Sequence, residues 1–394
     1  MADSKIRVCR DDDMKLNEIC EVYSGYALKA FNDAEDGFPV IKIGNIFMDG
    51  TLNLEECQYT TDGVNEKYYS QRGDIYIALS GATTGKIGIM DASEKYVINQ
   101  RVGIVRQKSD DIPQEYIKYF LLRQTDRILQ EAAGCAQPNI SPRQIAEYVV
   151  PDTSQEKMQE ICEVLDRIKK IIDSRKVQIS ALDNLIKARF VEMFGDPVAN
   201  EKGWTTKPLL DMGKCKNGMN FHYDDKGIEI NCLGVGDFKN LSIIDNTEEL
   251  PTILLNEMPS EEYLLKDDDI VFVRSNGNKA LVGRSLAVYP GDVPTTFSGF
   301  CIRYRKHDNE ITVPYLLRVL KTDSMRMKMA GRGANIQNLN QQILGTLVIP
   351  VPPVELQNQF AAFVTEVNKS KVKVQKALEE TQKLFDSLMQ QYFG

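Results

Sequence analysis

The fold of this chain is decided by residues 154–195, SQEKMQEICEVLDRIKKIIDSRKVQISALDNLIKARFVEMFG. Apolar residues recur in this stretch in alternating steps of four and three, which is the a/d seam of a coiled coil, and Arg175 occupies the one polar seam position. Around forty residues at about 1.5 Å each predict a rod on the order of 60 Å, and a rod of that length needs a partner helix. Its apolar seam positions are Ile161, Leu165, Ile168, Ile172, Ile179, Leu182 and Ile186.

A second stretch, before the end of the chain, repeats this pattern and ends in the same Phe-Gly pair, with Lys371 and Thr381 as its polar seam positions. We predict that the two arms pair antiparallel, with one globular unit at each end of a stiff spacer. Alternatively, each arm packs back on its own domain as an ordinary amphipathic helix. Counted from Gln155 and from Gln357, the first arm is three residues longer, so we expect the arms to depart from strict equivalence. The apolar seam positions of the second arm are Phe360, Val364, Val367, Val374, Leu378, Phe385, Leu388 and Tyr392.

The repetition extends upstream of both arms, so one architectural unit is used twice. The separations between matched residues drift, as expected when insertions fall in loops. Short β-rich runs at residues 75–78 and 270–273 and helical patterns at 114–130 and 313–329 predict a mixed α and β fold. The matched anchors are Leu16, Ile19 and Gly25 with Leu209, Met212 and Gly218; Ile43-Gly44-Asn45 with Val235-Gly236-Asp237; Asp74-Ile75 and Ser80 with Asp269-Ile270 and Ser275; and Tyr116 and Leu121 with Tyr315 and Leu320.

Length and composition limit the class of protein. At 394 residues the chain is too long for one ordinary domain, and we predict globular units at 1–152 and 197–353 and helical segments at 153–196 and 354–394. Residues 1–10 lack the pattern of a secretory leader and no run of 18 apolar residues occurs, so we expect a cytoplasmic protein that does not span a membrane. The eight cysteines form no C-x-x-C pair and there are only two histidines. We therefore expect no disulfide framework, no metal site and no hydrolytic centre.

Charge is unevenly distributed in the second unit, although the whole chain carries a net charge of -8. Residues 241–269 hold nine acidic side chains against one lysine, whereas 271–334 hold eleven Lys and Arg against four acids. Arg and Lys neutralise phosphates, Arg also bridges guanine, and Asn or Gln bridges adenine, so the mixture suits duplex DNA. A solvated charged face would have the same composition. The basic half includes Arg274, Lys279, Arg284, Arg303, Arg305, Arg318, Lys321, Arg326, Lys328 and Arg332.

Two nucleotide-binding motifs are incomplete. Residues 81–87, GATTGKI, have one residue too few between the glycines for a phosphate loop and lack Ser or Thr after the lysine, so we predict a turn between strands. Residues 234–236, GVG, lack the third glycine of a dinucleotide fingerprint.

The chain resembles the specificity subunits of type I restriction-modification systems. The resemblance is carried by the run from Arg72-Gly73-Asp74-Ile75 to Gly88, by residues 137–141 (QPNIS), and by the segment from Gln155 to Pro197, and with their repetition it covers nearly the whole chain. It implies two pseudo-repeated α+β target recognition domains, joined by two long antiparallel coiled-coil helices. Each domain would bind one half of a bipartite DNA target, and the helices would set the gap between the halves.

The resemblance also implies the partners of the chain. They are double-stranded DNA, two modification (methyltransferase) subunits that carry S-adenosylmethionine, and restriction subunits that use ATP and Mg²⁺. The chain itself would carry no cofactor and no catalytic residue, which agrees with its lack of an Asn-Pro-Pro-aromatic or Asp-Pro-Pro-aromatic tetrapeptide. A scaffold whose coiled coil tethers two protein- or peptide-binding domains is the alternative, and a self-contained nuclease or methyltransferase is a third.

Candidate DNA contacts lie on the loops where the two copies differ most. For Asn139, Ser141, Asn338 and Asn340, at the entry to the shared segment before each arm, capping of a helix or turn stands beside DNA contact as an interpretation. The predicted base-contacting or phosphate-binding residues are Thr83, Thr84, Lys86 and Arg101 in the first unit, and Arg274, Asn276, Asn278, Lys279 and Arg284 in the second.

Overall fold

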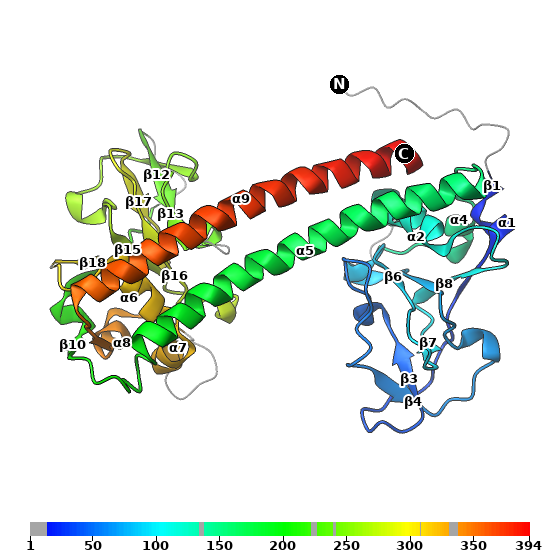
Figure 1. The fold of residues 1–394 in the computed structure, drawn as a ribbon, viewed down its shortest axis with the longest axis horizontal. Helices are drawn as coiled ribbons and strands as arrows, with labels where there is room; N and C mark the ends of the chain where they lie inside the picture. Colours follow the sequence, from blue (N-terminus) through cyan, green and yellow to red (C-terminus); the bar gives the residue numbers. More distant parts are fainter. Residues whose placement is uncertain (1–13, 134–137, 222–226, 239–241, 308, 331–337) are drawn as a thin grey trace. The chain divides into compact units, whose positions relative to one another are not determined.

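The computed structural model describes residues 14–133, 138–221, 227–238, 242–307, 309–330 and 338–394, which fall into two compact units. Unit 1 combines the chain up to Lys176 with Lys376–Gly394, and unit 2 is Val177–Gln375. Two long helices, α5 (Gln155–Phe194) and α9 (Val354–Phe393), are each shared between the units, because both cross a unit boundary without interruption (Figure 1).

Unit 1 contains a four-stranded, a three-stranded and a two-stranded sheet. Its strands are β1 (Met14–Lys15), β2 (Cys20–Ser24), β3 (Phe38–Ile41), β4 (Gln58–Thr60), β5 (Ile75–Ala78), β6 (Ile87–Ile89), β7 (Val97–Ile98), β8 (Val102–Gln107) and β9 (Val149–Val150). Its helices, besides its part of α5 and α9, are α1 (Leu16–Ile19), α2 (Gln114–Arg123), α3 (Thr125–Ala132) and α4 (Pro142–Ala146), with the 3-10 turns η1 (Ile43–Asn45), η2 (Glu66–Tyr68) and η3 (Gly81–Thr83).

The four-stranded sheet, in the order β2-β8-β5-β6, is antiparallel and lies between two layers. All four residues of β5 are buried, and they alternate between two hydrophobic clusters. Ile75 and Ile77 pack with α2 and α3, whereas Tyr76 and Ala78 pack toward the second sheet, β4-β3-β7. This period of two is what a strand covered on both faces requires.

Unit 2 repeats this architecture with one further strand. Its strands are β10 (Thr206–Pro208), β11 (Gly213–Asn217), β12 (Ile228–Leu233), β13 (Ile243–Ile244), β14 (Thr252–Leu255), β15 (Asp269–Val273), β16 (Ser285–Val288), β17 (Thr295–Phe297), β18 (Cys301–Lys306) and β19 (Val348–Pro350). Its helices, besides its part of α5 and α9, are α6 (Val313–Leu320), α7 (Asp323–Ala330) and α8 (Gln341–Gly345), with the 3-10 turns η4 (Leu209–Asp211), η5 (Val235–Asp237), η6 (Glu261–Tyr263) and η7 (Lys279–Leu281).

The sheet orders of the two units correspond strand by strand. Sheet β11-β18-β15-β16 of unit 2 corresponds to β2-β8-β5-β6, and sheet β14-β12-β17 to β4-β3-β7. Strand β13 extends the larger sheet of unit 2 by pairing parallel with β16. The chain therefore contains two copies of one α+β domain, as predicted.

Several predicted anchor pairs occupy equivalent positions. Tyr116 donates its hydroxyl hydrogen to the carbonyl of Pro151 at 2.8 Å, and Tyr315 donates to that of Pro350 at 2.9 Å. Gly25 and Gly218 both lie where a Cβ atom would collide with backbone carbonyl oxygens of the neighbouring strand. Only glycine permits so close an approach, so sequence and geometry agree on these anchors.

An Asp–Arg ion pair is buried in the larger sheet of each unit. Arg106 on β8 donates to both carboxylate oxygens of Asp74, at 2.7 and 2.6 Å, and Arg305 on β18 donates to both oxygens of Asp269 at the same distances. The side chains of the two aspartates are only 1% and 0% exposed. Each arginine also donates to a backbone carbonyl in the loop before β5 or β15, that of Tyr69 or Leu264. This bond connects the loop to the sheet.

Each of the expected helical segments after β8 and β18 is two helices rather than one. The break lies at Gln124 in unit 1 and at residues 321–322 in unit 2. At both breaks a threonine hydroxyl bonds a carbonyl three residues earlier, from Thr125 to Leu122 at 2.9 Å and from Thr322 to Val319 at 2.7 Å. Such a bond competes with the backbone hydrogen bonds that would continue the helix.

The long helices pair antiparallel within each unit. In unit 1, Leu165 near the start of α5 belongs to the same buried cluster as Met389 near the end of α9. In unit 2, Phe190 near the end of α5 packs on Phe360 near the start of α9, with ring centroids 5.5 Å apart. All predicted apolar seam residues are buried or partly buried.

Both helices contain 40 residues, so the expected three-residue difference is wrong. Helix α9 begins at Val354, directly after Pro353, and Gln357 lies one turn inside it. The backbone amides of Leu356 and Gln357 both donate to the carbonyl of Pro353, which fixes this start. The two arms are therefore equivalent in length.

The polar seam residues make contacts between the helices. Lys371 bonds both carboxylate oxygens of Asp183 at 2.7 and 2.8 Å within unit 2. In unit 1, Arg175 donates to the carbonyl of Ala377, which also accepts the hydroxyl of Thr381 at 2.7 Å. In each unit a polar contact thus joins the two helices, and a shift of the helix pair would separate these hydrogen-bonded groups.

Candidate nucleic-acid interface

Two loops at equivalent places carry the predicted DNA contacts other than Arg101. In unit 1 the loop joins β5 to β6, and in unit 2 it joins β15 to β16. The amide of Ala78 donates to the carbonyl of Lys86, and that of Val273 donates to the carbonyl of Arg284, both at 2.9 Å. Lys86 and Arg284 therefore occupy the same position, and each copy has a cation there.

The side chain of Thr84 stabilises the first loop. Thr84 is only 6% exposed, and its hydroxyl donates to the carbonyl of Gly81 at 2.7 Å. The hydroxyl of Thr83 is buried and has no hydrogen-bond partner among the residues that the structure describes. The segment forms a turn between strands, as predicted, and both hydroxyls face into the protein.

The second loop is shaped by asparagines. The Oδ1 atom of Asn276 accepts from the amide of Asn278 at 2.7 Å, and the Oδ1 atom of Asn278 accepts from the amide of Ala280 at 3.1 Å, which caps η7. Asn278 and Lys279 are exposed, whereas Asn276 is partly buried. Arg274, at the base of the loop, donates to the carbonyl of Gly299 at 3.3 Å.

A third pair of equivalent positions lies beside these loops, and sequence comparison singled out a candidate contact there in one copy only. The amide of Leu79 donates to the carbonyl of Arg101 at 2.9 Å, and the amide of Arg274 donates to the carbonyl of Phe300 at 2.8 Å. Arg101 and Phe300 are thus equivalent, in the turns before β8 and β18. The side chain of Phe300 is 61% exposed. The sequence signal that could have identified Phe300 is an aromatic residue in a Ser-Gly-Phe turn directly before a buried strand.

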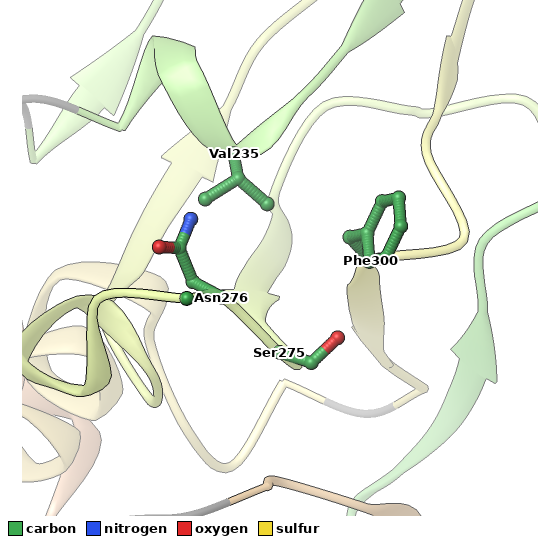
Figure 2. Close-up of a pocket in the computed structure, with 5 residues that line it drawn as sticks. Val235, Ser275, Asn276 and Phe300 are labelled. Carbon is green, nitrogen blue, oxygen red and sulfur yellow. The ribbon is translucent and has the colours of Figure 1, made fainter.

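Phe300 lies at the edge of a hollow of about 440 Å³ in unit 2. In Figure 2 the side chains of Val235 and Asn276 lie close to each other, and Phe300 lies across the opening. Val235 belongs to η5, which is closed by a bond from the amide of Gly234 to Asp237 at 2.8 Å. The hollow is lined by Val235, Ser275, Asn276, Gly277 and Phe300.

The basic residues of unit 2 have several structural roles. Arg305 forms the buried ion pair with Asp269. Arg303, only 6% exposed, donates to the carbonyl of Glu262 at 2.9 Å, and burial lowers the pKa of its guanidinium. These two arginines stabilise the sheet and do not line the hollow. Arg332 lies outside the described residues.

A second group of cations gathers beside the long helices within unit 2. The ammonium group of Lys321 donates to the hydroxyl of Ser242 at 2.8 Å. Burial, together with the neighbouring cations, lowers the pKa of Lys321 to about 8. This group is separate from the residues that line the hollow. The charged residues that act on Lys321 are Arg318, Lys371, Asp183 and Arg284.

Two of the four polar residues before the arms cap helices. Ser141 accepts from the amide of Gln144 at 3.3 Å and begins α4, and Asn340 accepts from the amide of Ile343 at 2.8 Å and begins α8. Asn139 forms an isolated β-bridge with Ser80. The capping interpretation therefore holds for Ser141 and Asn340.

Within the described parts of the chain, no three His, Cys, Asp or Glu side chains form a group that could hold a metal ion. Six cysteines there are free, and Cys9 and Cys135 lie outside those parts. Among the helices formed by the described residues, none is long and apolar enough to cross a membrane.

Comparison with known proteins places both halves of the chain in one family. Residues 12–183 and 201–382 match the family model described as type I restriction modification DNA specificity domain. The StySPI type I restriction enzyme specificity subunit of Salmonella potsdam is 24% identical over 399 residues, which cover 93% of this chain and 84% of that protein.

Two solved structures have the same fold over nearly the whole chain. The S subunit of a type I restriction-modification system from M. genitalium aligns with a TM-score of 0.53 at 17% identity and covers 99% of this chain and 98% of its own. A chain from a structure described as the basis of complex assembly and conformational transition of the type I R-M system aligns with a TM-score of 0.59 at 14% identity, covering 97% of both chains.

Proposed function

The chain belongs to the type I restriction-modification DNA specificity family, as a non-catalytic subunit that recognises DNA, and on this premise we propose that each unit binds one half of a bipartite target. The observation that carries the proposal is the duplication of one domain with unlike loops. Equivalent backbone positions hold Lys86 and Arg284, which are alike, and Arg101 and Phe300, which are not. A shared scaffold with different exposed side chains suits the recognition of two different half-sites.

The candidate contacts differ in what they offer DNA. Lys86 and Arg101 in unit 1, and Arg274, Lys279 and Arg284 in unit 2, supply cations for phosphates or guanine. Asn276 and Asn278 supply amides for adenine. The hydroxyls of Thr83 and Thr84 face inward, so these residues would affect DNA binding only through the shape of the first loop, which the bond of Thr84 to Gly81 stabilises.

The long helices connect the two recognition functions. We assign target recognition domains to residues 1–152 and 197–353, and helical spacers to 153–196 and 354–394. The equal length of α5 and α9 and their antiparallel pairing in each unit support a spacer that sets the gap between half-sites. The polar contacts of Arg175 and Lys371 fit a role in fixing its register.

Specificity subunits of this family act together with other subunits of the restriction-modification system. We propose that the helices and nearby surfaces of this chain recruit two modification subunits, which carry S-adenosylmethionine, and restriction subunits, which use ATP and Mg²⁺. The assembly would act in the cytoplasm.

The roles of Arg303 and Arg305 within the sheet would by themselves favour the alternative of a protein-tethering scaffold, because they remove two cations from those available to DNA. Family membership weighs against that alternative, since the matched domain is a DNA specificity domain and both halves of the chain match it.

The test is to co-express the chain with the modification subunit encoded beside it and to map adenine methylation across a DNA library by single-molecule sequencing. Methylation confined to one bipartite motif is the expected result and would identify both half-sites. A stable complex that methylates without sequence preference would refute the specificity role. If no complex forms, the result would favour the alternative of a protein-tethering scaffold.

A further inference from the structure

The hollow in unit 2 combines an amide with apolar side chains. Asn276 lies next to Val235, and the exposed ring of Phe300 lies across from them (Figure 2). Backbone hydrogen bonds link two of these groups. The carbonyl of Phe300 accepts from the amides of Arg274 and Ser275 at 2.8 and 3.4 Å, so the turn that carries the ring is bonded to the start of the loop that carries the amide.

The chemistry of this hollow matches one base pair. In the major groove adenine presents an acceptor at N7 and a donor at N6, and thymine presents its 5-methyl group. The amide of Asn276 has a donor for N7, and its Oδ1 atom keeps a second lone pair for N6 beside its bond to Asn278. A G·C pair has no methyl group for Phe300 to cover and would place a polar edge against its ring.

From this arrangement we infer that the hollow recognises an A·T pair in the half-site bound by unit 2, with Asn276 on adenine and Phe300 against the thymine methyl group. The inference deepens the proposed function and rests on it. Phe300 is thereby a specificity-determining residue, and its counterpart in unit 1 is Arg101, whose guanidinium suits guanine or phosphate instead.

Modified bases test each contact separately in the complex with the modification subunit. Deoxyuridine lacks the thymine methyl group and 7-deazaadenine lacks N7. They would be placed one at a time through both half-sites, and the Kd measured by titration of labelled duplexes. At one thymine position, replacement by deoxyuridine should raise the Kd about threefold to fivefold. This is the size expected for the loss of one covered methyl group.

The protein variants connect each effect to its residue. Phe300→Ala should weaken binding to the normal duplex by a similar factor and remove the difference between thymine and deoxyuridine at that position. Asn276→Asp keeps the Oδ1 bond that shapes the loop but loses the amide donor, so it should remove the sensitivity to 7-deazaadenine. Leu254→Ala is the matched control. Leu254 is 48% exposed on β14, and its strand partner Glu229 lies at the other end of β12 from Val235.

The outcomes separate this inference from the proposed function. If the wild-type complex binds one bipartite sequence but no thymine responds to deoxyuridine, or if Phe300→Ala keeps the full response, the A·T assignment is wrong and the specificity role stands. If the wild-type complex prefers no sequence, the proposed function itself fails. Arg101→Ala should leave the deoxyuridine response at this position unchanged, since Arg101 belongs to the other unit.

Discussion

Replacing Arg106 with methionine should destabilise unit 1 strongly. Methionine fills part of the same space but leaves the carboxylate of Asp74, whose side chain is 1% exposed, without its cation. Removing one partner of a buried ion pair typically costs about 3–5 kcal/mol. Arg106 is itself only 13% exposed, so water cannot easily replace it. Its bond to the carbonyl of Tyr69 is lost as well, and the preceding loop should loosen.

Native-state hydrogen exchange is the suitable assay, because it reports each unit separately. The amides of β5 and β8 should lose protection equivalent to about 3–5 kcal/mol in Arg106→Met. The amides of β15 and β18 in unit 2 are the internal reference. Asp74→Asn added to Arg106→Met removes the buried charge, and the double variant should recover part of the lost protection.

Two results would refute this reasoning. The first is a loss below about 1 kcal/mol in Arg106→Met, the range of an exposed ion pair. The second is a double variant whose loss equals the sum of the two single losses, because groups that interact must show a coupling energy. The equivalent change Arg305→Met should act in the same direction on unit 2 but less strongly, since Arg305 is 28% exposed.

Three further outcomes are expected. Tyr116→Phe and Tyr315→Phe should each cost about 1–3 kcal/mol in urea unfolding, because each leaves a buried carbonyl without its donor; no change would mean that water replaces the hydroxyl. Lys371→Met should cost only about 0.2–1 kcal/mol by thermal unfolding, because its side chain and that of Asp183 are 32% and 47% exposed; a larger loss would assign the pair a greater role than its exposure allows. The pKa of Lys321 falls from 10.5 to about 8 on folding, so between these values the unfolded chain binds more protons and unit 2 should gain stability as pH rises. Calorimetry across this range should show the gain vanish in Lys321→Met, and a gain that persists would place the titration elsewhere.

Much of the fold was predictable from the sequence because its signals are local. The steps of three and four in residues 154–195 report a helix face directly, and the predicted seam positions are buried or partly buried. Predicted strand 75–78 coincides with β5, and 270–273 lies within β15, since compact β-branched and aromatic runs between turn residues are typical of buried strands. Repetition of these signals was enough to predict two copies of one domain.

The sequence was less informative where contacts are long-range. Arg305 looks like a DNA-binding cation in a basic segment, yet it pairs with Asp269, which lies 36 residues earlier in the chain. The predicted segment 354–394 includes the observed start of α9, but matching Gln357 with Gln155 made the second arm three residues shorter than the first.

The sequence by itself thus determined the duplicated α+β architecture, the two helical arms and the family, because helix periodicity, strand composition and motif order are local properties of the sequence. Only the tertiary structure decided which residues occupy equivalent places on the two loops and which charges are buried in ion pairs. The equivalence of Arg101 and Phe300 and the hollow beside Asn276 depend on hydrogen bonds between strands distant in sequence. Because the loops of the two units differ in length, a comparison of the sequence alone cannot show which loop residues occupy equivalent positions.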